Sequence, residues 1–283
     1  MKPLVFSLLL VTSLQGWTQA GHYQVYALKF AHSALTVPLS ALVDHGPEND
    51  SVNMEFSIWL IKGDNGRNVL VDAGFQPDIV DSPDGKELAV VNYQRPDSAL
   101  QKVGLKAEDI SDIILSHPHW DHCDGIALFP KAHIWMQKED YNYFVGGSWQ
   151  KGENSGGYYK RDVRVLVDLN MAGRLTLVDG DDKEIIPGIK VFTGSRHTFN
   201  SQYALVEAAG HRIILASDNI WVYYSLEHLQ PASKGGTLDP EGYVKAMIRM
   251  KTLTGNPRYI IPGHDARVYT IFPKVADGVV RIE

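Results

Sequence analysis

Short apolar runs separated by turn residues recur along the chain, and they predict a protein rich in β-strands. The first such run covers residues 23–28, and two further runs cover residues 56–62 and 69–72. Between the latter two lies Asp64-Asn65-Gly66, and an Asn-Gly pair between apolar runs favours a β-hairpin. We therefore expect a first strand at 23–28 and a hairpin over residues 56–72.

The middle of the chain alternates between helical and extended patterns. Residues 97–103 have a helical pattern, and residues 113–115 form a short apolar run that is typical of a buried strand. A short helix is expected at 126–129 and another strand at 133–136. His133 alternates with apolar neighbours in that strand, so we interpret it as a core or edge histidine whose ring is satisfied by the protein.

The second half of the chain repeats the strand pattern. Strands are expected at residues 175–178, 189–193, 203–207 and 212–216. Metal-binding residue types come soon after apolar strands at three places: His197, Asp218 and His264. Each is a weak signal alone, but all three lie in the same kind of position, on loops that follow strands.

Between Tyr141 and Asn170 the chain changes character. Two glycine pairs, Gly146-Gly147 and Gly156-Gly157, lie among several tyrosines, a phenylalanine and a tryptophan. We predict a cap inserted over about residues 141–170. Two interpretations of its aromatic residues stay open: they form an apolar wall for a substrate, or they are buried within a helical hairpin on the surface.

The first twenty residues have the order of a secretory signal peptide. Lys2 provides the positive charge, residues 4–14 are apolar, and Thr18-Gln19-Ala20 forms a small-x-small cleavage site before Gly21. The apolar run is shorter than the roughly 20 residues of a transmembrane helix. We expect a signal peptide at 1–20, one domain at 21–283, and a periplasmic or secreted protein; an uncleaved anchor or a buried first strand is the alternative.

The amino-acid composition is that of an ordinary globular protein, and it limits the classes of partner that the protein can bind. Of 283 residues, 44% are hydrophobic and 21% are charged, with a formal net charge of −6. This size suits one α/β domain. The mild acidity and the lack of a Lys/Arg cluster argue against nucleic acid, and no segment beyond the N-terminus looks membranous. A small-molecule substrate is the expected partner; the oligomeric state is left open, a homodimer being one option.

Candidate metal ligands are concentrated in residues 116–125, whose sequence is SHPHWDHCDG. His117 and His119 are separated by one residue, so both imidazoles can bind one ion. Asp121 and His122 follow at once, and a turn there would aim both at a second position beside the first. Chance gives such a pattern on the order of once per thousand chains. Imidazole and carboxylate ligands suit zinc, with manganese or iron as alternatives.

Two neighbouring residues leave alternatives open. Cys123 is the only cysteine, which excludes an intrachain disulfide and argues against a closed structural zinc site, since such sites usually contain several cysteines. We favour Cys123 as a small buried residue behind the metal loop, over a thiol near the ions. Asp72 ends a predicted strand, where it either orients a histidine of the metal loop or is a plain turn residue.

With these residues in place, the chain resembles the metallo-β-lactamase-fold hydrolases over about residues 56–267. The resemblance rests on the His-x-His-x-Asp-His motif of residues 117–122 together with His197, Asp218 and His264. It implies an α/β fold, specifically an αββα sandwich with the metals at one edge, and a helical or loop cap insertion.

The resemblance also implies a ligand set and a mechanism. One zinc ion would be held by His117, His119 and His197, a second by Asp121, His122 and His264, with Asp218 bridging the two. Two such ions would lower the pKa of a shared water, so that a bridging hydroxide attacks a carbonyl that one ion polarises. Asp121 would act in catalysis as well, by orienting that hydroxide or passing a proton to the leaving group.

The substrate class is suggested by details of the motif. A bridging carboxylate resembles the lactonase, glyoxalase II and phosphodiesterase branches, and chain size with a cap favours the acyl-homoserine lactonases, which act in quorum quenching. An exported metallo-β-lactamase is the alternative, favoured by the signal sequence. A metal-binding redox partner is a third class, but the chain has no second flavin domain and no cysteine cluster.

Two departures from the lactonase pattern concern the substrate pocket. Such lactonases often have a tyrosine three residues after the bridging aspartate, whereas Trp221 stands there in this chain. Tyr223 and Tyr224 come just beyond, so we predict that they replace the missing hydroxyl as catalytic hydrogen-bond donors. Residues 194–200 also lack the Pro-Gly that commonly follows the threonine of this loop.

Overall fold

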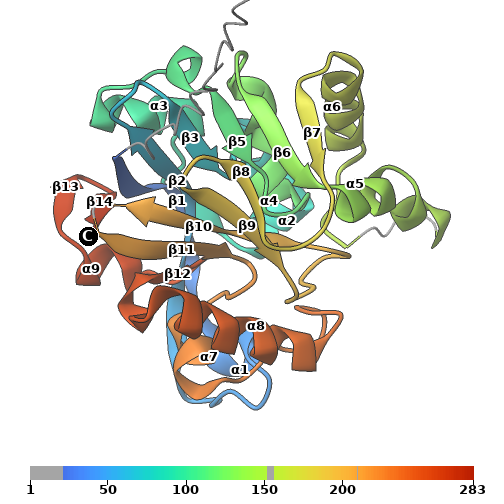
Figure 1. The fold of residues 1–283 in the computed structure, drawn as a ribbon. Coiled ribbons are helices and arrows are strands. Elements are labelled where there is room, and N and C mark those ends of the chain that lie inside the picture. Colours follow the sequence, from blue (N-terminus) through green and yellow to red (C-terminus); the bar gives the residue numbers. More distant parts are fainter. Residues whose placement is uncertain (1–21, 152–155, 209) are drawn as a thin grey trace, which may run out of the picture.

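The structure is a computed structural model that describes residues 22–151, 156–208 and 210–283. Two mixed β-sheets pack face to face, and helices cover the outer face of each sheet (Figure 1). This is the αββα sandwich that the sequence resemblance implied, so the predicted fold class is confirmed. The predicted signal peptide at residues 1–20 lies outside the described residues.

The larger sheet holds the first half of the described chain and a C-terminal hairpin. Its strands are β1 (Tyr23–Pro38), β2 (Ser51–Gly63), β3 (Asn68–Val71), β4 (Val90–Val91), β5 (Asp112–Ile114), β6 (His133–Gln137), β7 (Leu175–Val178), β13 (Lys274–Ala276) and β14 (Val279–Ile282). They lie in the order β13-β14-β1-β2-β3-β5-β6-β7, with β4 beside β1. The pairs from β3 to β7 are parallel, and the other pairs are antiparallel.

The smaller sheet is built from the second half of the chain. Its strands are β8 (Lys183–Ile186), β9 (Ile189–Thr193), β10 (Gln202–Ala208), β11 (His211–Ser217) and β12 (Ile260–Pro262), in the order β12-β11-β10-β9-β8. Only the β11–β12 pair of this sheet is parallel. Because β11 and β12 run the same way, the residues that follow them emerge at the same edge of the sheet.

The helices of the described residues are short apart from two. They are α1 (Leu39–Leu42), α2 (Pro83–Glu87), α3 (Pro96–Ala99), α4 (Trp120–Cys123), α5 (Lys138–Val145), α6 (Lys160–Met171), α7 (Tyr223–His228), α8 (Pro240–Thr254) and α9 (Val268–Ile271). Single 3₁₀ turns are η1 (Pro77–Asp81), η2 (Leu100–Val103), η3 (Ala107–Asp109), η4 (Asp124–Leu128), η5 (Gly147–Lys151) and η6 (Pro257–Tyr259). Helices α5 and α6 form the cap beside β6 and β7, and α8 covers β11 and β12 (Figure 1).

Strand β2 shows how one strand supplies two hydrophobic cores. Trp59 and Ile61 are buried in the core between the two sheets. Ile58 and Leu60 are buried in the second core, between the larger sheet and its helices. Successive side chains of a strand point to opposite faces, so a strand covered on both faces is a continuous apolar run.

Most predicted elements are present, with differences in length. The hairpin over residues 56–72 is confirmed as β2 and β3, and the strands at 175–178 and 189–193 are β7 and β9. The predicted strand at 23–28 is too short, because β1 continues to Pro38 and pairs with β2 along nearly its full length. The expected helix at 126–129 is the 3₁₀ turn η4.

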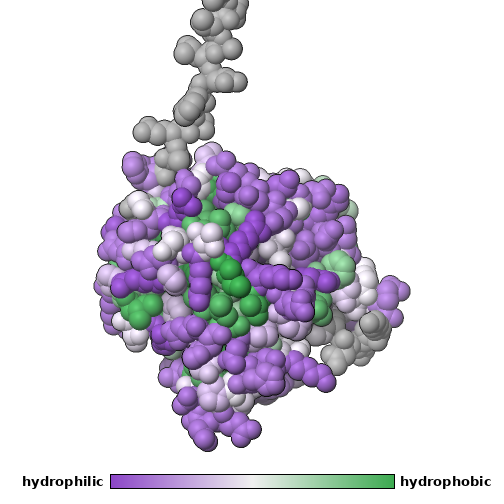
Figure 2. Space-filling model, turned by 60° about the horizontal axis from the view of Figure 1, so that its bottom comes forward, coloured by the Kyte–Doolittle hydropathy of each residue, from purple (hydrophilic) through white to green (hydrophobic). Residues whose placement is uncertain are grey.

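The surface of the described chain is mainly hydrophilic on the face that Figure 2 shows, with hydrophobic side chains gathered near its centre. Helices long and apolar enough to cross a membrane are absent from residues 22–151, 156–208 and 210–283.

Candidate metal centre

The candidate ligands come from four loops that meet at one edge of the sandwich. The loop after β5 carries His117 and His119, and the first turn of α4 adds Asp121 and His122. His197 lies between β9 and β10, whereas Asp218 follows β11 directly and His264 follows β12. The structure therefore brings together all seven residues that the sequence singled out.

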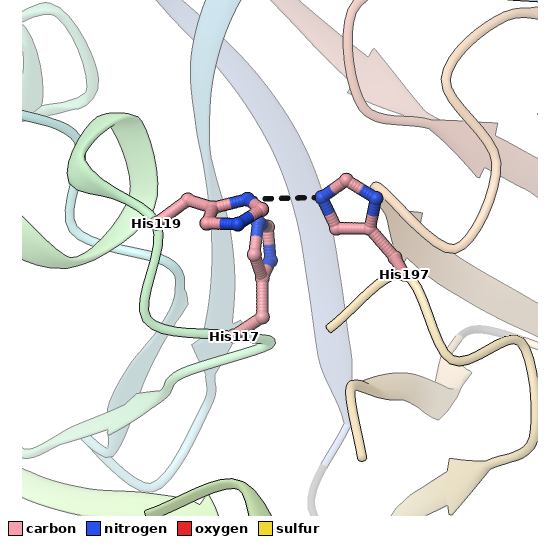
Figure 3. Close-up of side chains that lie close together, drawn as sticks. All are labelled: His117, His119 and His197. Carbon is pink, nitrogen blue, oxygen red and sulfur yellow. Dashed lines mark hydrogen bonds between the residues drawn. The ribbon is translucent and has the colours of Figure 1, made fainter. Parts of the chain in front are cut away.

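The first group consists of three histidines, which Figure 3 shows converging from two separate loops. The Nδ1 atom of His119 lies 3.0 Å from Nε2 of His197. The Oδ2 atom of Asp218 lies 3.4 Å from Nε2 of His197 and 3.9 Å from Nε2 of His117. Three imidazoles and one carboxylate oxygen thus surround one point, a tetrahedral number of ligands.

The second group lies on the other side of Asp218. Its Oδ1 atom is 3.1 Å from Nε2 of His264 and 3.2 Å from Nε2 of His122. The Oδ2 atom of Asp121 is 3.3 Å and 3.5 Å from the same two nitrogens. The two oxygens of Asp218 therefore face different groups, as a bridging carboxylate would.

The outer nitrogens of four histidines are held by oxygen atoms. The contacts are Ser116 Oγ to His117 Nδ1 (2.8 Å), Asp72 Oδ2 to His122 Nδ1 (2.8 Å), Gly236 O to His197 Nδ1 (2.8 Å), and Glu55 O to His264 Nδ1 (3.0 Å). Such contacts fix the ring orientation and leave the Nε2 atom free to bind a metal.

Asp72 connects several of the loops that carry ligands. Its Oδ2 atom accepts hydrogen bonds from Ser217 Oγ (2.7 Å), His122 Nδ1 (2.8 Å) and Ser116 Oγ (2.9 Å), while Oδ1 accepts from the backbone N–H of Ser116 (2.8 Å). Asp72 is fully buried, and its φ of 62° lies in the left-handed region. The interpretation of Asp72 as an orienting residue is confirmed.

Three buried ligand atoms without hydrogen-bond partners indicate whether a metal fits this site. Among the described residues, His117 Nε2, His122 Nε2 and Asp218 Oδ1 have no hydrogen-bond partner. Buried polar atoms are almost always satisfied, and each of these three is aimed at its group. Divalent cations would satisfy all of them, and imidazole with carboxylate is a ligand set that zinc accepts.

The ligand histidines differ in protonation. Burial opposes charging of His122 and His264, but the neighbouring Asp121 and Asp218 carboxylates raise the pKa of both imidazoles. Burial lowers the pKa of His119 to about 3, with a further contribution from His197. Burial opposes ionisation of Asp218, yet the imidazoles of His264 and His122 hold the pKa of its carboxyl well below the usual range. Metal ligands must be deprotonated, so neutral imidazole and ionised carboxylate are the forms required.

Two sequence-based interpretations concern residues outside the ligand set. The Cys123 thiol is buried in the core beneath the larger sheet, and burial raises its pKa well above the usual range. The Nε2 atom of His133 lies 2.7 Å from Thr176 Oγ1 on the neighbouring strand. Cys123 as a buried filler and His133 as a histidine whose ring is satisfied by the protein are both confirmed, although β6 is an interior strand of the sheet.

Tyr223 and Tyr224 require a correction, because helix α7 carries them away from the ligands. The Tyr223 ring packs under the guanidinium of Arg267 at 4.9 Å, and the Tyr224 ring stacks on His228 at 4.0 Å. Within the described chain, no hydrogen bond, ion pair or ring contact joins either tyrosine to the seven ligand residues. The residue in contact with Asp218 is Trp221, whose Nε1–H donates to Oδ2 over 2.8 Å.

Some aromatic residues of the cap are buried within it, and another lies beside a ligand histidine. Tyr141 and Phe144 are buried, as expected for a packed helical hairpin. In contrast, the Tyr158 ring lies 5.2 Å from the His119 ring, and Tyr143 stacks on the half-exposed Phe199 at 4.7 Å. The cap therefore places apolar surface beside the metal centre.

Comparison with known proteins agrees with this geometry. The family model described as the Metallo-beta-lactamase superfamily matches residues 57–220. An N-acyl homoserine lactonase from Bacillus sp is 25% identical over 252 residues, covering 82% of this chain and 94% of that protein. The N-acyl homoserine lactonase AiiA from Bacillus thuringiensis subsp. kurstaki is 24% identical, covering 79% and 89%.

Solved structures show the same fold. A variant of B. thuringiensis AiiA with N-decanoyl-L-homoserine at its active site has a TM-score of 0.69 at 20% identity, covering 89% of this chain and 96% of that one. AidC, a dizinc quorum-quenching lactonase, has a TM-score of 0.64 at 16% identity, covering 87% and 88%. With the family match over residues 57–220, the chain belongs to the metallo-beta-lactamase superfamily and is a metal-dependent hydrolase.

Proposed function

We propose that this hydrolase binds two divalent metal ions, zinc by preference, and opens lactone rings, with N-acyl homoserine lactones as the substrate class. The observation that carries the proposal is the position of Asp218 between the two ligand groups, with one carboxylate oxygen toward each. The relatives named above support the lactone part, since those relatives are N-acyl homoserine lactonases.

Two zinc ions at this site would polarise the lactone carbonyl and make hydroxide available near neutral pH. Asp121 is the carboxylate of the site with most access to solvent, its side chain being 12% exposed against 6% for Asp218. Burial opposes its ionisation, but the neighbouring His122 lowers the pKa of the Asp121 carboxyl. Asp121 can therefore accept a proton from the attacking water and return it to the leaving alkoxide.

Ring opening of an ester suits the residues around the metals. An alkoxide is a better leaving group than an amide nitrogen, so an ester requires less proton donation than a β-lactam. Aromatic side chains lie close to the ligand histidines: the Tyr158 ring is 5.2 Å from the His119 ring, and Tyr143 stacks on Phe199, two residues after His197. Their apolar surface can bind an acyl chain by burial of hydrocarbon.

Metal analysis followed by a substrate comparison tests the proposal. Purified holo-protein should contain about two equivalents of zinc, manganese or iron, and it should turn over an N-acyl homoserine lactone faster than a cephalosporin. A well-folded protein with less than one equivalent would refute the metal centre. Faster turnover of the cephalosporin, with no lactone accepted, would instead favour the β-lactamase alternative.

Export to the periplasm or the medium is a separate proposal. It rests on the order of charge, apolar run and small-x-small site in residues 1–20. Sequencing of the mature N-terminus from the native host should give a start near Gly21. Recovery of intact Met1 from the soluble cytosolic fraction would contradict it.

A further inference from the structure

We propose that Trp221 is a positioning residue of the metal centre: its indole N–H sets the orientation of Asp218, and its ring and backbone hold a histidine from each ligand group. The inference rests on the two-metal site of the proposed function. It assigns a role to the residue that stands where the predicted tyrosine donor is missing.

The indole contact restrains the rotation of the Asp218 carboxylate about its Cβ–Cγ bond. Trp221 Nε1–H donates to Oδ2 over 2.8 Å, and Oδ2 is the oxygen that faces the group of His117 and His197. The other oxygen, Oδ1, is thereby left toward the second group, without a hydrogen-bond partner among the described residues. A bridging ligand needs this division, since rotation of the carboxylate would remove one oxygen from each group.

The Trp221 ring supports His197 both directly and through a glycine. The two rings meet edge to face, with centroids 5.5 Å apart and planes at 75°. Gly236 packs against the indole so closely that a Cβ added there would lie 2.5 Å from Trp221 Cη2. The carbonyl of the same glycine accepts the Nδ1–H of His197 over 2.8 Å.

The backbone of Trp221 reaches the second ligand group. Its carbonyl accepts a hydrogen bond from the His264 N–H over 3.0 Å. Its own N–H donates to the buried hydroxyl of Tyr243 over 3.3 Å, which fixes the peptide from the α8 side. One residue thus contacts Asp218, His197 and His264, which come from loops after three different strands.

The indole N–H is committed to Asp218, so this N–H acts on the reaction through a ligand and is not available to a substrate carbonyl. If the ligand side chains are already oriented before the metal binds, less of the binding free energy of the ions is spent on ordering them. Loss of an outer-shell contact of this kind typically weakens metal affinity by about 10- to 100-fold.

The matched variants W221F and W135F separate this role from simple packing. Trp135 Nε1–H donates to Asp112 Oδ1 over 2.9 Å in the larger sheet, so both substitutions remove an indole–carboxylate hydrogen bond. Zinc affinity is measured by competition with a chromophoric chelator. We expect W221F to bind zinc about tenfold more weakly and W135F to stay within about twofold of the unaltered protein.

Two further measurements distinguish the loss of the indole N–H from a general loss of stability. Replacement of Trp221 by 3-benzothienylalanine keeps the ring shape and removes only the N–H, so this variant should lose zinc affinity like W221F even if W221F folds poorly. After loading with Co²⁺, its d–d absorption bands should differ from those of the unaltered protein, because the ligand field of Asp218 changes.

The outcomes distinguish this inference from the proposed function. Two bound equivalents in the unaltered protein, with unchanged zinc affinity and Co²⁺ spectrum in the isosteric variant, would overturn the role of Trp221 alone. Equal losses in W221F and W135F would also overturn it, since they indicate a general stability effect. Fewer than two equivalents in the unaltered protein would overturn the two-metal site and this inference together.

Discussion

The carboxylate of Asp72 accepts a hydrogen bond from Nδ1 of His122 over 2.8 Å, although the two residues are 50 positions apart in the chain. Asp72 directly follows the hairpin strand β3, and His122 lies in the first turn of α4. The same carboxylate oxygen accepts from Ser217, the residue before Asp218. The larger sheet thus orients a ligand of the second group and the loop of the bridging ligand at once.

Asp72→Asn tests this contact. The amide nitrogen places a donor where hydrogen bonds are accepted, so His122 should lose its fixed orientation. We expect zinc affinity and lactone turnover to fall by about 10- to 100-fold. Asp64→Asn in the hairpin turn is the control, and elemental analysis after dialysis should show metal loss in the first variant alone.

His119→Ala and His133→Ala form a matched pair of histidine substitutions. His119 Nδ1 belongs to the first ligand group, whereas His133 bonds Thr176 on the neighbouring strand. His119→Ala should lose most lactone turnover and bound metal, and His133→Ala should retain both. Equal metal content in the two variants would contradict the ligand assignment.

Gly236→Ala introduces a methyl group into the contact with Trp221. The new Cβ would lie 2.5 Å from Trp221 Cη2 and 2.7 Å from Ala232 Cβ, so the loop or the indole must shift. We expect the free energy of unfolding to fall by about 1–3 kcal/mol, as in other overpacked sites. Gly146→Ala, whose Cβ would meet only Asn142 O at 3.3 Å, should show a smaller change in denaturant unfolding.

Asp140 gives a prediction about pH. Burial raises the pKa of its carboxyl from 3.8 to about 6, partly opposed by the hydrogen bond from Thr198. Because the folded state binds this proton more tightly, the contribution to stability is complete below about pH 4 and is lost as the pH rises through 6; it amounts to roughly 3 kcal/mol. The unfolding free energy of the unaltered protein minus that of Asp140→Asn should therefore decrease from pH 4.5 to 6.5. A difference that stays constant over this range would refute the assignment.

Tyr223→Phe and Tyr224→Phe should each leave kcat/KM for a lactone within about twofold, since no contact joins either ring to the ligand groups in the described chain. A loss of tenfold or more, equivalent to about 1.4 kcal/mol of transition-state binding, would restore the hydroxyl role predicted from sequence. Circular dichroism serves as the folding control for Tyr223, because its side chain is buried.

Local sequence was sufficient for much of the fold. The apolar runs that became β7 and β9 are bounded by turn residues, and the Asn-Gly pair between β2 and β3 specifies its hairpin. Helix α8 was not predicted, although Tyr243, Ala246, Met247 and Met250 form a buried stripe at helical spacing. The second half of β1 carried no such signal, since its exposed residues become a strand only by pairing with β2.

The sequence by itself determined which residues can serve as metal ligands. The candidate histidines and aspartates follow apolar strands, so they must lie in loops at the ends of those strands. Only the tertiary structure decided which neighbouring side chain serves the site. In sequence, Asp72 was equally compatible with an orienting role and with a plain turn residue. Tyr223 lies only two residues beyond Trp221, so the spacing did not show which of the two side chains reaches Asp218. The start of α7 at Tyr223 sends the tyrosines toward Arg267 and His228, and leaves the indole of Trp221 against Asp218. Side-chain direction depends on where a helix begins and on what packs against it, and residue spacing does not specify either.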